Sequence, residues 1–297
     1  MYILFSSNAV DNLEYQGGTG ENDTSMEAQI VERAQNRLEA ILLIVDGLIV
    51  VLTGGMSYYV AGKTLRPVAD AYAAQKKFVA DAAHELRTPL TVLRTGAETV
   101  LNEGGSKEEY EKYIRDSLEE SECLTGLVND LLFLARGKDL RKAEQVKLDF
   151  GLIARQQAEF MRPYARMKKV RISYVNGENA NCFVKGNPDQ LKRLLNNLIK
   201  NAIDYNREEG AVDISLNGDS KQMVLRVANT GGGIDSAEIP NIYERFYKSD
   251  AARARATGGS GLGLSIVREI VEAHKGKIDI KSKPEVGTEV FVSFPAA

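Results

Sequence analysis

The sequence predicts a multidomain chain: a transmembrane helix, an antiparallel helical hairpin, and a C-terminal α/β two-layer sandwich. Residues 41–61 are apolar except for Asp46. Residues 78–137 carry apolar side chains at helical spacing, and residues 146–297 alternate helical and strand patterns. These three observations assign the transmembrane helix, the hairpin and the sandwich in that order.

Composition argues against nucleic-acid binding. The formal net charge is −3 and the pI is about 5.7, whereas nucleic-acid-binding domains usually have a basic surplus. Tryptophan is absent, so stacking platforms for single strands are not expected. Cys123 and Cys182 lie far apart and predict free thiols in a reducing compartment. Histidine occurs only as His84 and His274, so histidine chemistry depends on one of these two.

Residues 41–61 have the length and composition of a transmembrane helix. About 20 apolar residues cross the hydrocarbon core as an α-helix, and Asp46 is the only charged residue of this stretch. A carboxylate in lipid is costly unless it is protonated or paired. Asp46 therefore leaves open the alternative of a buried core helix, while Tyr58 and Tyr59 suit a membrane interface.

Charge beside the apolar stretch predicts its orientation. It is followed closely by Lys63, Arg66, Lys76 and Lys77. Positive charge favours the cytoplasmic side, so residues 1–40 are expected outside the cell and residues 62–77 form a juxtamembrane linker inside it. Residues 1–5 are apolar and suit either the end of a truncated first membrane helix or a poor signal-like start. Residues 16–25 predict a flexible loop.

Two helices are predicted before the sandwich. The first, at residues 64–101, is interrupted by Pro67 and Pro89, and the second, at residues 107–136, has the apolar spacing of a bundle seam. The short link between them predicts an antiparallel hairpin. One hairpin is too thin to bury its own core, so residues 78–137 are expected to form a four-helix bundle in a homodimer.

Beyond a charged linker at residues 137–144, helices and strands alternate. Helices are predicted at residues 150–168, 188–205 and 262–274, and strands at residues 170–175, 211–216, 223–228, 277–280 and 289–294. Asn217-Gly218-Asp219 predicts a hairpin turn between two of these strands. His274 follows a helix and is expected to cap it and interact with its dipole, with no catalytic role.

His84 lies in the string FVADAAHELRTPLTVLR, residues 78–94. On a helix His84 and Thr88 share a face, and Glu85 is close enough to orient the imidazole so that one ring nitrogen stays free as a nucleophile. Pro89 predicts a bend below the histidine. The string closely resembles the phosphoacceptor box of sensor histidine kinases. That resemblance implies that His84 accepts phosphate, Glu85 is its acid–base partner, and Thr88 positions a water for the reverse reaction.

The string LLNNLIKNAIDY, residues 194–205, places Asn197 and Asn201 on one helical face. Alone this would be a polar stripe on a half-buried helix, but it resembles the N box of the same family. The resemblance implies that Asn201 binds Mg²⁺, Asn197 faces the phosphates and Tyr205 contacts the nucleotide. The family often has Lys where this chain has Asp204, so a phosphate contact is either missing or supplied by Lys200.

The string VANTGGGI, residues 227–234, resembles a D-x-G-x-G pattern in the same family. Gly231 and Gly233 match the glycines, which allow a ligand to approach the backbone, although a plain loop would have the same composition. Asn229 replaces the acid that accepts a hydrogen bond from the adenine amino group. An amide oxygen can accept the same bond without the charge, so the replacement puts ATP affinity in doubt more than the fold.

Two further strings resemble the F box and the glycine-rich box of the family, at residues 243–250 and 257–267. The second places glycine at the three G-x-G-x-G positions, where a helix start can cradle phosphate: Gly259, Gly261 and Gly263. Residues 251–257 suit a mobile lid. Two basic residues are expected either at the γ-phosphate or as solvated surface charge, Arg245 and Lys248. Thr288 belongs to a further short motif before the last strand.

The resemblance covers about residues 63–294 and implies a Bergerat-type ATP-binding fold that uses ATP and Mg²⁺. It implies a two-step reaction, in which His84 takes the γ-phosphoryl group and passes it to an aspartate of a response regulator, with phosphatase activity on that regulator. The expected location is a bacterial inner or plasma membrane, with the catalytic part cytoplasmic.

Two alternatives remain open. Asn229 and Asp204 motivate a degenerate kinase that acts as a binding scaffold. Another ATPase of the same superfamily, of the chaperone or mismatch-repair type, is the second. The His84 string argues against that second alternative.

Overall fold

The computed structural model describes residues 21–104, 106–177, 182–249 and 259–297. The chain divides into two compact units, Met1–Gln75 and Lys76–Ala297. Residues 1–20 and 250–258, which hold the apolar start of the chain and the expected lid, lie outside the described residues.

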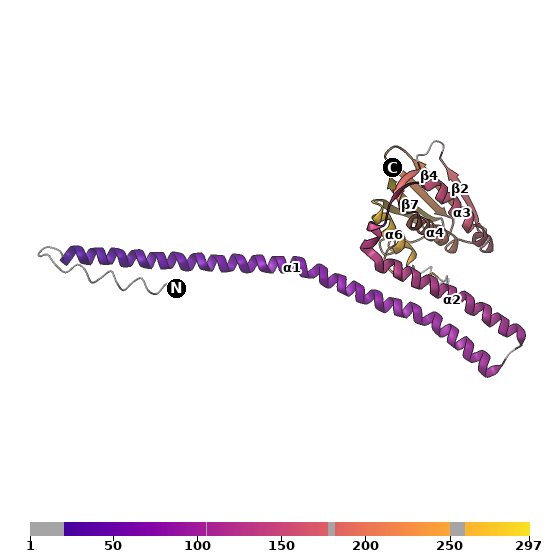
Figure 1. The fold of residues 1–297 in the computed structure, drawn as a ribbon, viewed down its shortest axis with the longest axis horizontal. Coiled ribbons are helices and arrows are strands. Elements are labelled where there is room, and N and C mark those ends of the chain that lie inside the picture. The colour runs from indigo at the N-terminus through magenta and orange to yellow at the C-terminus, as the bar shows by residue number, and fades with distance from the viewer. Residues whose placement is uncertain (1–20, 105, 178–181, 250–258) are drawn as a thin grey trace. The chain divides into compact units, whose positions relative to one another are not determined.

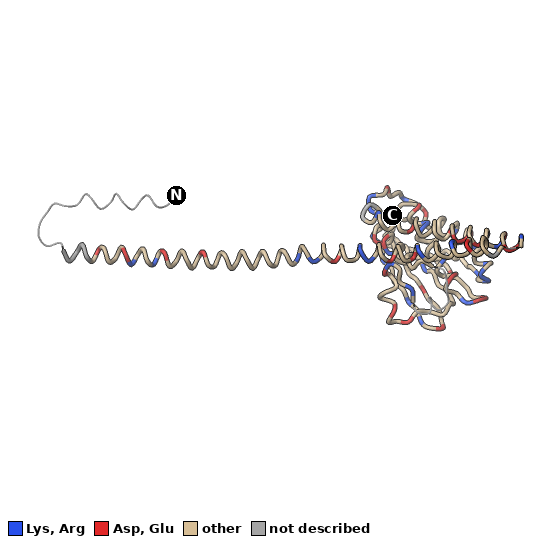
Figure 2. Tube along the Cα trace, turned by 90° about the horizontal axis from the view of Figure 1, so that it is seen from below, with Lys and Arg blue, Asp and Glu red and all other residues tan. Residues whose placement is uncertain are grey.

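Helix α1, Glu21–Glu103, contains the predicted membrane segment (Figure 1). Within the described part of the chain it is the one helix long and apolar enough to cross a membrane. Its apolar side chains at residues 41–61 are exposed, for example Leu43 at 73% and Val51 at 70%. Figure 2 shows this stretch as a tan segment of the tube with little charge. The apolar side chains of this segment are thus not buried within its own unit, as they would be in the core helix that Asp46 left open as an alternative.

Helix α1 is longer than the sequence suggested. It is helical from Glu21, so the loop predicted at residues 16–25 is wrong over its described part. It also continues through Pro67 and Pro89, so neither proline interrupts it, and residues 62–77 are helical. Each proline removes one backbone hydrogen bond, which a long helix tolerates because the neighbouring turns keep theirs.

Helix α2, Lys107–Arg136, begins with a capping box. Ser106 Oγ accepts a hydrogen bond from the Glu109 N–H, and the Ser106 N–H donates to Glu109 Oε2 at 2.7 Å. The Tyr113 hydroxyl donates to the Leu93 carbonyl of α1 at 3.1 Å. The predicted linker after α2 is instead a short 3₁₀ helix, Gly137–Lys142.

The sandwich has a five-stranded sheet in the order β2-β4-β5-β7-β6. Its strands are β2 Arg171–Asn176, β4 Ala211–Gly218, β5 Gln222–Asn229, β6 Lys277–Lys283 and β7 Gly287–Pro295. Among the described strands of this sheet, β2 and β4 pair in parallel and the other neighbours pair antiparallel. The hairpin predicted around residues 217–219 joins β4 and β5. A separate pair, β1 Val146–Asp149 with β3 Phe183–Gly186, was not predicted.

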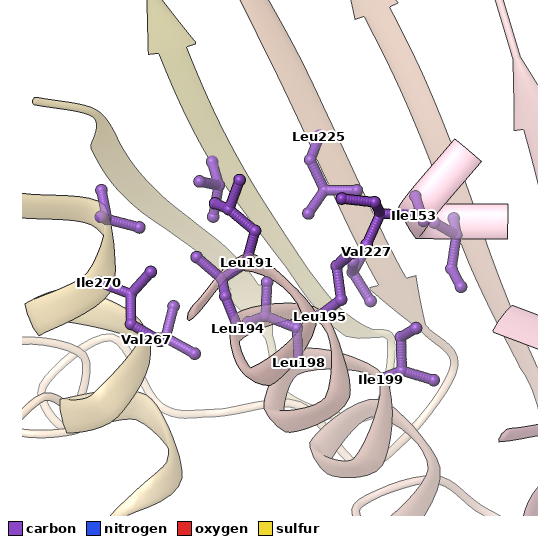
Figure 3. Close-up of a cluster of buried hydrophobic side chains, with 14 of the residues drawn as sticks. Ile153, Leu191, Leu194, Leu195, Leu198, Ile199, Leu225, Val227, Val267 and Ile270 are labelled. Atoms are coloured by element: carbon purple, nitrogen blue, oxygen red, sulfur yellow. The ribbon is translucent and has the colours of Figure 1, made fainter. Parts of the chain in front are cut away.

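Within the described residues, the second layer is formed by α3 Phe150–Met167, α4 Pro188–Asp204 and α6 Gly263–Ala273. Figure 3 shows the buried leucines of α4 directed at β5, with α6 and Ile153 of α3 on either side. Leu191, Leu194 and Leu195 are fully buried. The i, i+3, i+4 spacing of these leucines turns the apolar face of α4 to the sheet and leaves its polar face free.

His274 caps the end of α6, as the sequence predicted, but its burial disfavours the charge with which it would interact with the helix dipole. It is 5% exposed. Its Nε2 accepts from the Asn187 N–H at 3.0 Å, so Nδ1 carries the proton and donates to the Ile270 carbonyl at 2.8 Å. Burial lowers the pKa of His274, because desolvation penalises the charged ring. A neutral His274 thus joins the end of α6 to the start of α4.

Candidate functional site

The sandwich contains a pocket between α4 and the ends of two neighbouring strands. Asn229, the last residue of β5, lies opposite Thr288 near the start of β7, and Val227 lies opposite Val290. All four line the pocket, because residues two apart on a strand share a face. Leu198 of α4 and Ile280 of β6 complete the apolar wall.

The Asn229 amide is held by two backbone groups. Its Oδ1 accepts from the Thr288 N–H at 2.9 Å, and its Nδ2 donates to the Ala202 carbonyl at 3.2 Å. Thr288 Oγ1 lies 2.7 Å from Ser282 Oγ, which also donates to the Gly287 carbonyl and accepts from the Ile234 N–H. The polar floor of this apolar pocket is therefore fixed before any ligand arrives.

The glycines after β5 are required by close backbone packing. A Cβ on Gly231 would lie 2.0 Å from the Tyr205 carbonyl oxygen. Gly233 has a φ of +72°, and a Cβ there would lie 2.1 Å from the Lys283 carbonyl oxygen. Gly233 also lines the pocket. The two glycines thus let the chain turn tightly between α4 and β6 at the pocket mouth.

Asn197 and Asn201 lie on the polar face of α4 and converge on Gly263, where α6 begins. A Cβ on Gly263 would lie 3.0 Å from Asn197 Oδ1, 3.4 Å from Asn201 Nδ2 and 3.5 Å from Asn201 Oδ1. Asn197 Nδ2 donates to the Arg193 carbonyl, which leaves its Oδ1 free, and the Asn201 amide makes no hydrogen bond with the described residues. The Asn197 oxygen and the end of the Asn201 amide therefore lie at the start of α6.

The Lys200 ammonium beside this site is paired with the Asp204 carboxylate. Its Nζ lies 2.5 Å from Asp204 Oδ2, and the Tyr164 hydroxyl donates to Asp204 Oδ1 at 2.5 Å. The Asp204 side chain is 13% exposed. Burial, followed by the hydrogen bond to Asp204, raises the pKa of Tyr164. Asp204 therefore engages the lysine that could have replaced the missing phosphate contact, although Lys200 remains half exposed and can exchange partners.

The glycine-rich segment lies against Tyr205. A Cβ on Gly259 would lie 3.2 Å from the Tyr205 hydroxyl. Gly261 has a φ of +70°, and its carbonyl accepts from the Phe246 N–H at 3.0 Å. Burial raises the pKa of Tyr205, with a smaller contribution from Asp204. Tyr205 thus lies between the apolar pocket and the glycines at the start of α6.

A second, wider pocket continues from the first. The two share Asn201, Tyr205 and Lys248, among others. The second pocket is lined by Asn197, by Gly259, Gly261 and Gly263, and, on α1, by Glu85 and Thr88. A continuous hollow thus runs from Asn229 to the histidine-bearing helix.

Two basic residues meet that helix. Lys248 Nζ lies 3.2 Å from Glu85 Oε2. Arg245 pairs with Glu269 at 3.4 Å, and its guanidinium lies 5.0 Å from the centre of the Phe78 ring. Lys248 lines the apolar pocket, whereas Arg245 lines a separate hollow with His84. The two residues predicted together at the γ-phosphate are therefore placed differently.

His84 is exposed on α1 and lines that separate hollow with Glu85 and Asp81. Thr88, one turn away, donates to the His84 carbonyl at 3.5 Å. Glu85 contacts Lys248 and has no bond to the imidazole. The structure thus brings the three predicted residues together on one helix, with Glu85 turned toward the sandwich.

Sequence comparison assigns both parts of this site. Residues 74–139 match the His Kinase A (phospho-acceptor) domain, and residues 186–297 match the histidine kinase-, DNA gyrase B- and HSP90-like ATPase domain. The probable sensor kinase SilS of Salmonella typhimurium is 34% identical over 218 residues, which are 72% of this chain and 44% of SilS.

The chain belongs to the sensor histidine kinases. It spans about half the length of the curated sensor kinases it matches. The phospho-acceptor match distinguishes it from the chaperone and mismatch-repair branches of the ATPase superfamily.

Solved histidine kinases share the fold. The kinase ThkA, in complex with the response regulator protein TrrA, has a TM-score of 0.62 at 21% identity, covering 80% of this chain and 66% of that one. Full-length ShkA in complex with AMPPNP has a TM-score of 0.54 at 25% identity, covering 75% of this chain and 46% of that one.

Several residues of the sensor kinase site were not identified from the sequence. Ile242, Tyr247 and Ile280 line the pocket, and Ser282 orders its floor. Strand alternation could have found Ile280. Ser282 acts through hydrogen bonds with the Ile234 N–H and with Thr288 Oγ1. These contacts are made by the tertiary fold, so no local sequence pattern identifies Ser282.

Proposed function

We propose that this chain binds ATP in the pocket floored by Asn229 and transfers the γ-phosphoryl group to His84. The observation that carries this proposal is the hollow that links the Asn229 pocket to Glu85 and Thr88 on the histidine helix. The nucleotide pocket and the histidine helix therefore border one hollow, whereas His84 itself lines a separate hollow on the same helix. Phosphoryl transfer thus requires a movement that brings the nucleotide and His84 together.

The pocket chemistry fits a nucleotide. Apolar walls at Val227, Val290 and Leu198 suit a base, and the Asn229 floor offers it hydrogen bonds. The glycines at the start of α6 would receive the phosphates, with Tyr205 beside them.

The amide oxygens fit Mg²⁺ as well. Asn201 would contribute one oxygen to the ion, with Asn197 facing the phosphates. The described residues hold no cluster of three His, Cys, Asp or Glu side chains that could bind a metal, which suits an ion that keeps waters and relies on phosphate ligands. When bound, Mg²⁺ would neutralise charge on the phosphates.

In the first step, a ring nitrogen of His84 attacks the γ-phosphorus. An N–P bond forms, the bond to the β-γ bridging oxygen breaks, and ADP leaves with that electron pair. Glu85 holds the proton of the other ring nitrogen. Because Glu85 is paired with Lys248, this pair must open before Glu85 can reach the imidazole. Opening would also free Lys248 for the phosphates, while Arg245 stays beside His84.

In the second step, the phosphoryl group passes from His84 to an aspartate of a response regulator. The exposure of His84 and Thr88 leaves this face of α1 open to a partner, and ThkA has been solved with such a regulator. Thr88, one turn from His84, would position a water in the reverse, phosphatase reaction.

The helical part is proposed to dimerise over residues 78–137. Several large apolar side chains of α1 and α2 are exposed in the single chain, including Leu90 at 62%, Leu101 at 81%, Ile114 at 56% and Leu118 at 60%. A second copy would cover them in a four-helix bundle, which would bury area that is costly to leave in water. The ATP-binding domain follows at residues 146–297.

The chain is proposed to lie in a bacterial inner or plasma membrane. Residues 41–61 would span it, residues 1–40 would lie outside, and residues 62–77 would carry α1 into the cytoplasm. The exposed apolar surface of α1 and the basic residues after it support this arrangement, because lipid covers such a surface and positive charge favours the inner side.

A kinase and a catalytically silent binding scaffold can be separated by labelling. The scaffold alternative rests on Asn229 and on the Lys200–Asp204 pair. The purified chain is incubated with Mg²⁺ and ATP labelled at the γ-phosphate, beside His84→Gln and the surface control Lys112→Gln. The kinase predicts acid-labile label in the wild type and the control, and none in His84→Gln. Nucleotide binding without label in any of the three chains would favour the scaffold.

A further inference from the structure

The amide of Asn229 can take only one orientation. Its Oδ1 faces the Thr288 N–H at 2.9 Å, and its Nδ2 faces the Ala202 carbonyl at 3.2 Å. Exchanging the two atoms would set an NH₂ group against an N–H donor and an oxygen against a carbonyl oxygen. Both contacts would then be repulsive, so the backbone determines which atom lies where.

One donor and one acceptor remain for a ligand. A side-chain amide has two N–H donors and two oxygen lone pairs. Asn229 uses one N–H donor for the Ala202 carbonyl and one oxygen lone pair for the Thr288 N–H. The residue lines the pocket and is only partly buried, which leaves its side-chain amide accessible to a ligand there. A carboxylate in this position would offer acceptors only, and would place an oxygen against the Ala202 carbonyl.

Adenine and 6-oxopurines present opposite hydrogen-bonding groups at positions 1 and 6. Adenine has an amino donor at position 6 and an acceptor at N1, whereas a 6-oxopurine has an oxygen acceptor at position 6 and an N1–H donor. A carboxylate accepts a hydrogen bond from the amino group of adenine, whereas beside a 6-oxopurine it can accept only from N1–H and is repelled by the oxygen at position 6. An amide with one free donor and one free acceptor can pair with either edge.

We propose that Asn229 makes this pocket accept 6-oxopurine nucleotides as well as adenine nucleotides. The proposal rests on the proposed nucleotide function of the same pocket and names the group that sets its base selectivity. A site that leaves a buried polar group unpaired rejects a ligand strongly. Here neither base leaves Asn229 unpaired, so the amino and oxo bases are bound with similar affinity.

The test is calorimetric titration of the purified full chain with ADP and with IDP, each with Mg²⁺. These diphosphates differ only at the edge that Asn229 faces, and neither can donate a γ-phosphoryl group. The wild type is expected to bind both with dissociation constants within about tenfold. Asn229→Asp is expected to raise the preference for ADP over IDP by about tenfold or more, because charged acceptors bind roughly twice as strongly and repel the oxo group.

Asn217→Asp is the matched control, because it makes the same substitution at an exposed position of β4 outside the pocket. It should leave the ADP to IDP ratio unchanged. A wild-type preference for ADP above about 100-fold would overturn the proposal even if Asn229→Asp fails to fold. An unchanged ratio in a folded Asn229→Asp would also overturn it. If neither nucleotide binds, the proposed nucleotide-binding function is wrong, and the base-selectivity proposal fails with it.

Discussion

The Asn201 amide has no hydrogen-bond partner among the residues that the structure describes. Asn201 lies on the polar face of α4, the end of its amide lies beside Gly263, and it lines both pockets. A free amide at the meeting point of two elements is poorly explained by stability, because packing does not use it. A role in holding Mg²⁺ and phosphate accounts for it.

Asn201→Ala is therefore expected to slow phosphorylation of His84 by about 100-fold, the scale on which one preorganised electrostatic contact contributes. The measurement is the initial rate of acid-labile labelling over a series of Mg²⁺ concentrations. Asn129→Ala, an exposed amide of α2, serves as the control and should keep the wild-type rate. A wild-type rate and Mg²⁺ dependence in Asn201→Ala would contradict the assignment.

Residue types at fixed spacing predicted much of this site. Asn197, Asn201 and Tyr205 share a helical face, and the structure places all three around one hollow. The Lys200–Asp204 pair follows the same i, i+4 rule. The bond from Asn229 to the Ala202 carbonyl could not be predicted, because it joins a strand end to a helix through the tertiary fold.

Elements were predicted where a periodic pattern was long. Helices α3, α4 and α6 and the strands of the main sheet lie within a few residues of their predicted bounds. The pair β1 and β3 was missed because each strand has four residues, too few to show alternation, and the two meet only through pairing distant in sequence. The sequence prediction gave the two prolines of α1 too much weight as helix breakers. The helix of 83 residues continues through both of them.

The pairing of α1 with α2 should depend on Gly96. A Cβ there would lie 2.8 Å from the Tyr113 ring, whose hydroxyl binds the Leu93 carbonyl. Gly96→Leu is expected to destabilise the helical part by about 1–3 kcal/mol, because the ring must move and its hydrogen bond is lost. Thermal unfolding of the purified chain measures this change.

Gly126→Ala in α2 is the matched control for Gly96→Leu, since nothing lies within 4 Å of a Cβ there. It should stabilise the helix by about 0.5–1 kcal/mol, because alanine restricts the unfolded chain. Equal effects of the two substitutions would show that Tyr113 does not pack on Gly96.

Acid should weaken the contact between α6 and α4. Burial holds the pKa of His274 below its ordinary value of about 6.5, so the unfolded chain takes up the proton first as pH falls. The contribution of neutral His274 to stability is complete above about pH 6.5 and is lost as pH falls from there through the lower folded pKa.

Melting temperatures of wild type and His274→Gln over this pH range test that role. Glutamine can accept from the Asn187 N–H without titrating, so its stability should fall less steeply on acidification. Equal slopes for the two chains would contradict the role given to His274.

At the scale of the whole molecule, the two cysteines allow the proposed orientation of the chain in the membrane to be tested. Cys123 is exposed on α2, and Cys182 is buried in the sandwich. Burial raises the pKa of the Cys182 thiol, which lowers its reactivity further. A membrane-impermeant maleimide should label the chain only after cells are permeabilised, and only at Cys123. Labelling in intact cells would place α2 outside and contradict the proposed topology.

The proposed function depends on which residue accepts the phosphoryl group. The most direct measurement is mass-spectrometric mapping of the purified chain after incubation with Mg²⁺ and ATP, with peptides kept at neutral to alkaline pH so that phosphohistidine survives. Phosphate is expected on the peptide that contains His84, and it is expected to be absent from that peptide when the chain is incubated with ADP. Phosphate on the His274 peptide, or acid-stable phosphate on serine or threonine in place of His84, would contradict it.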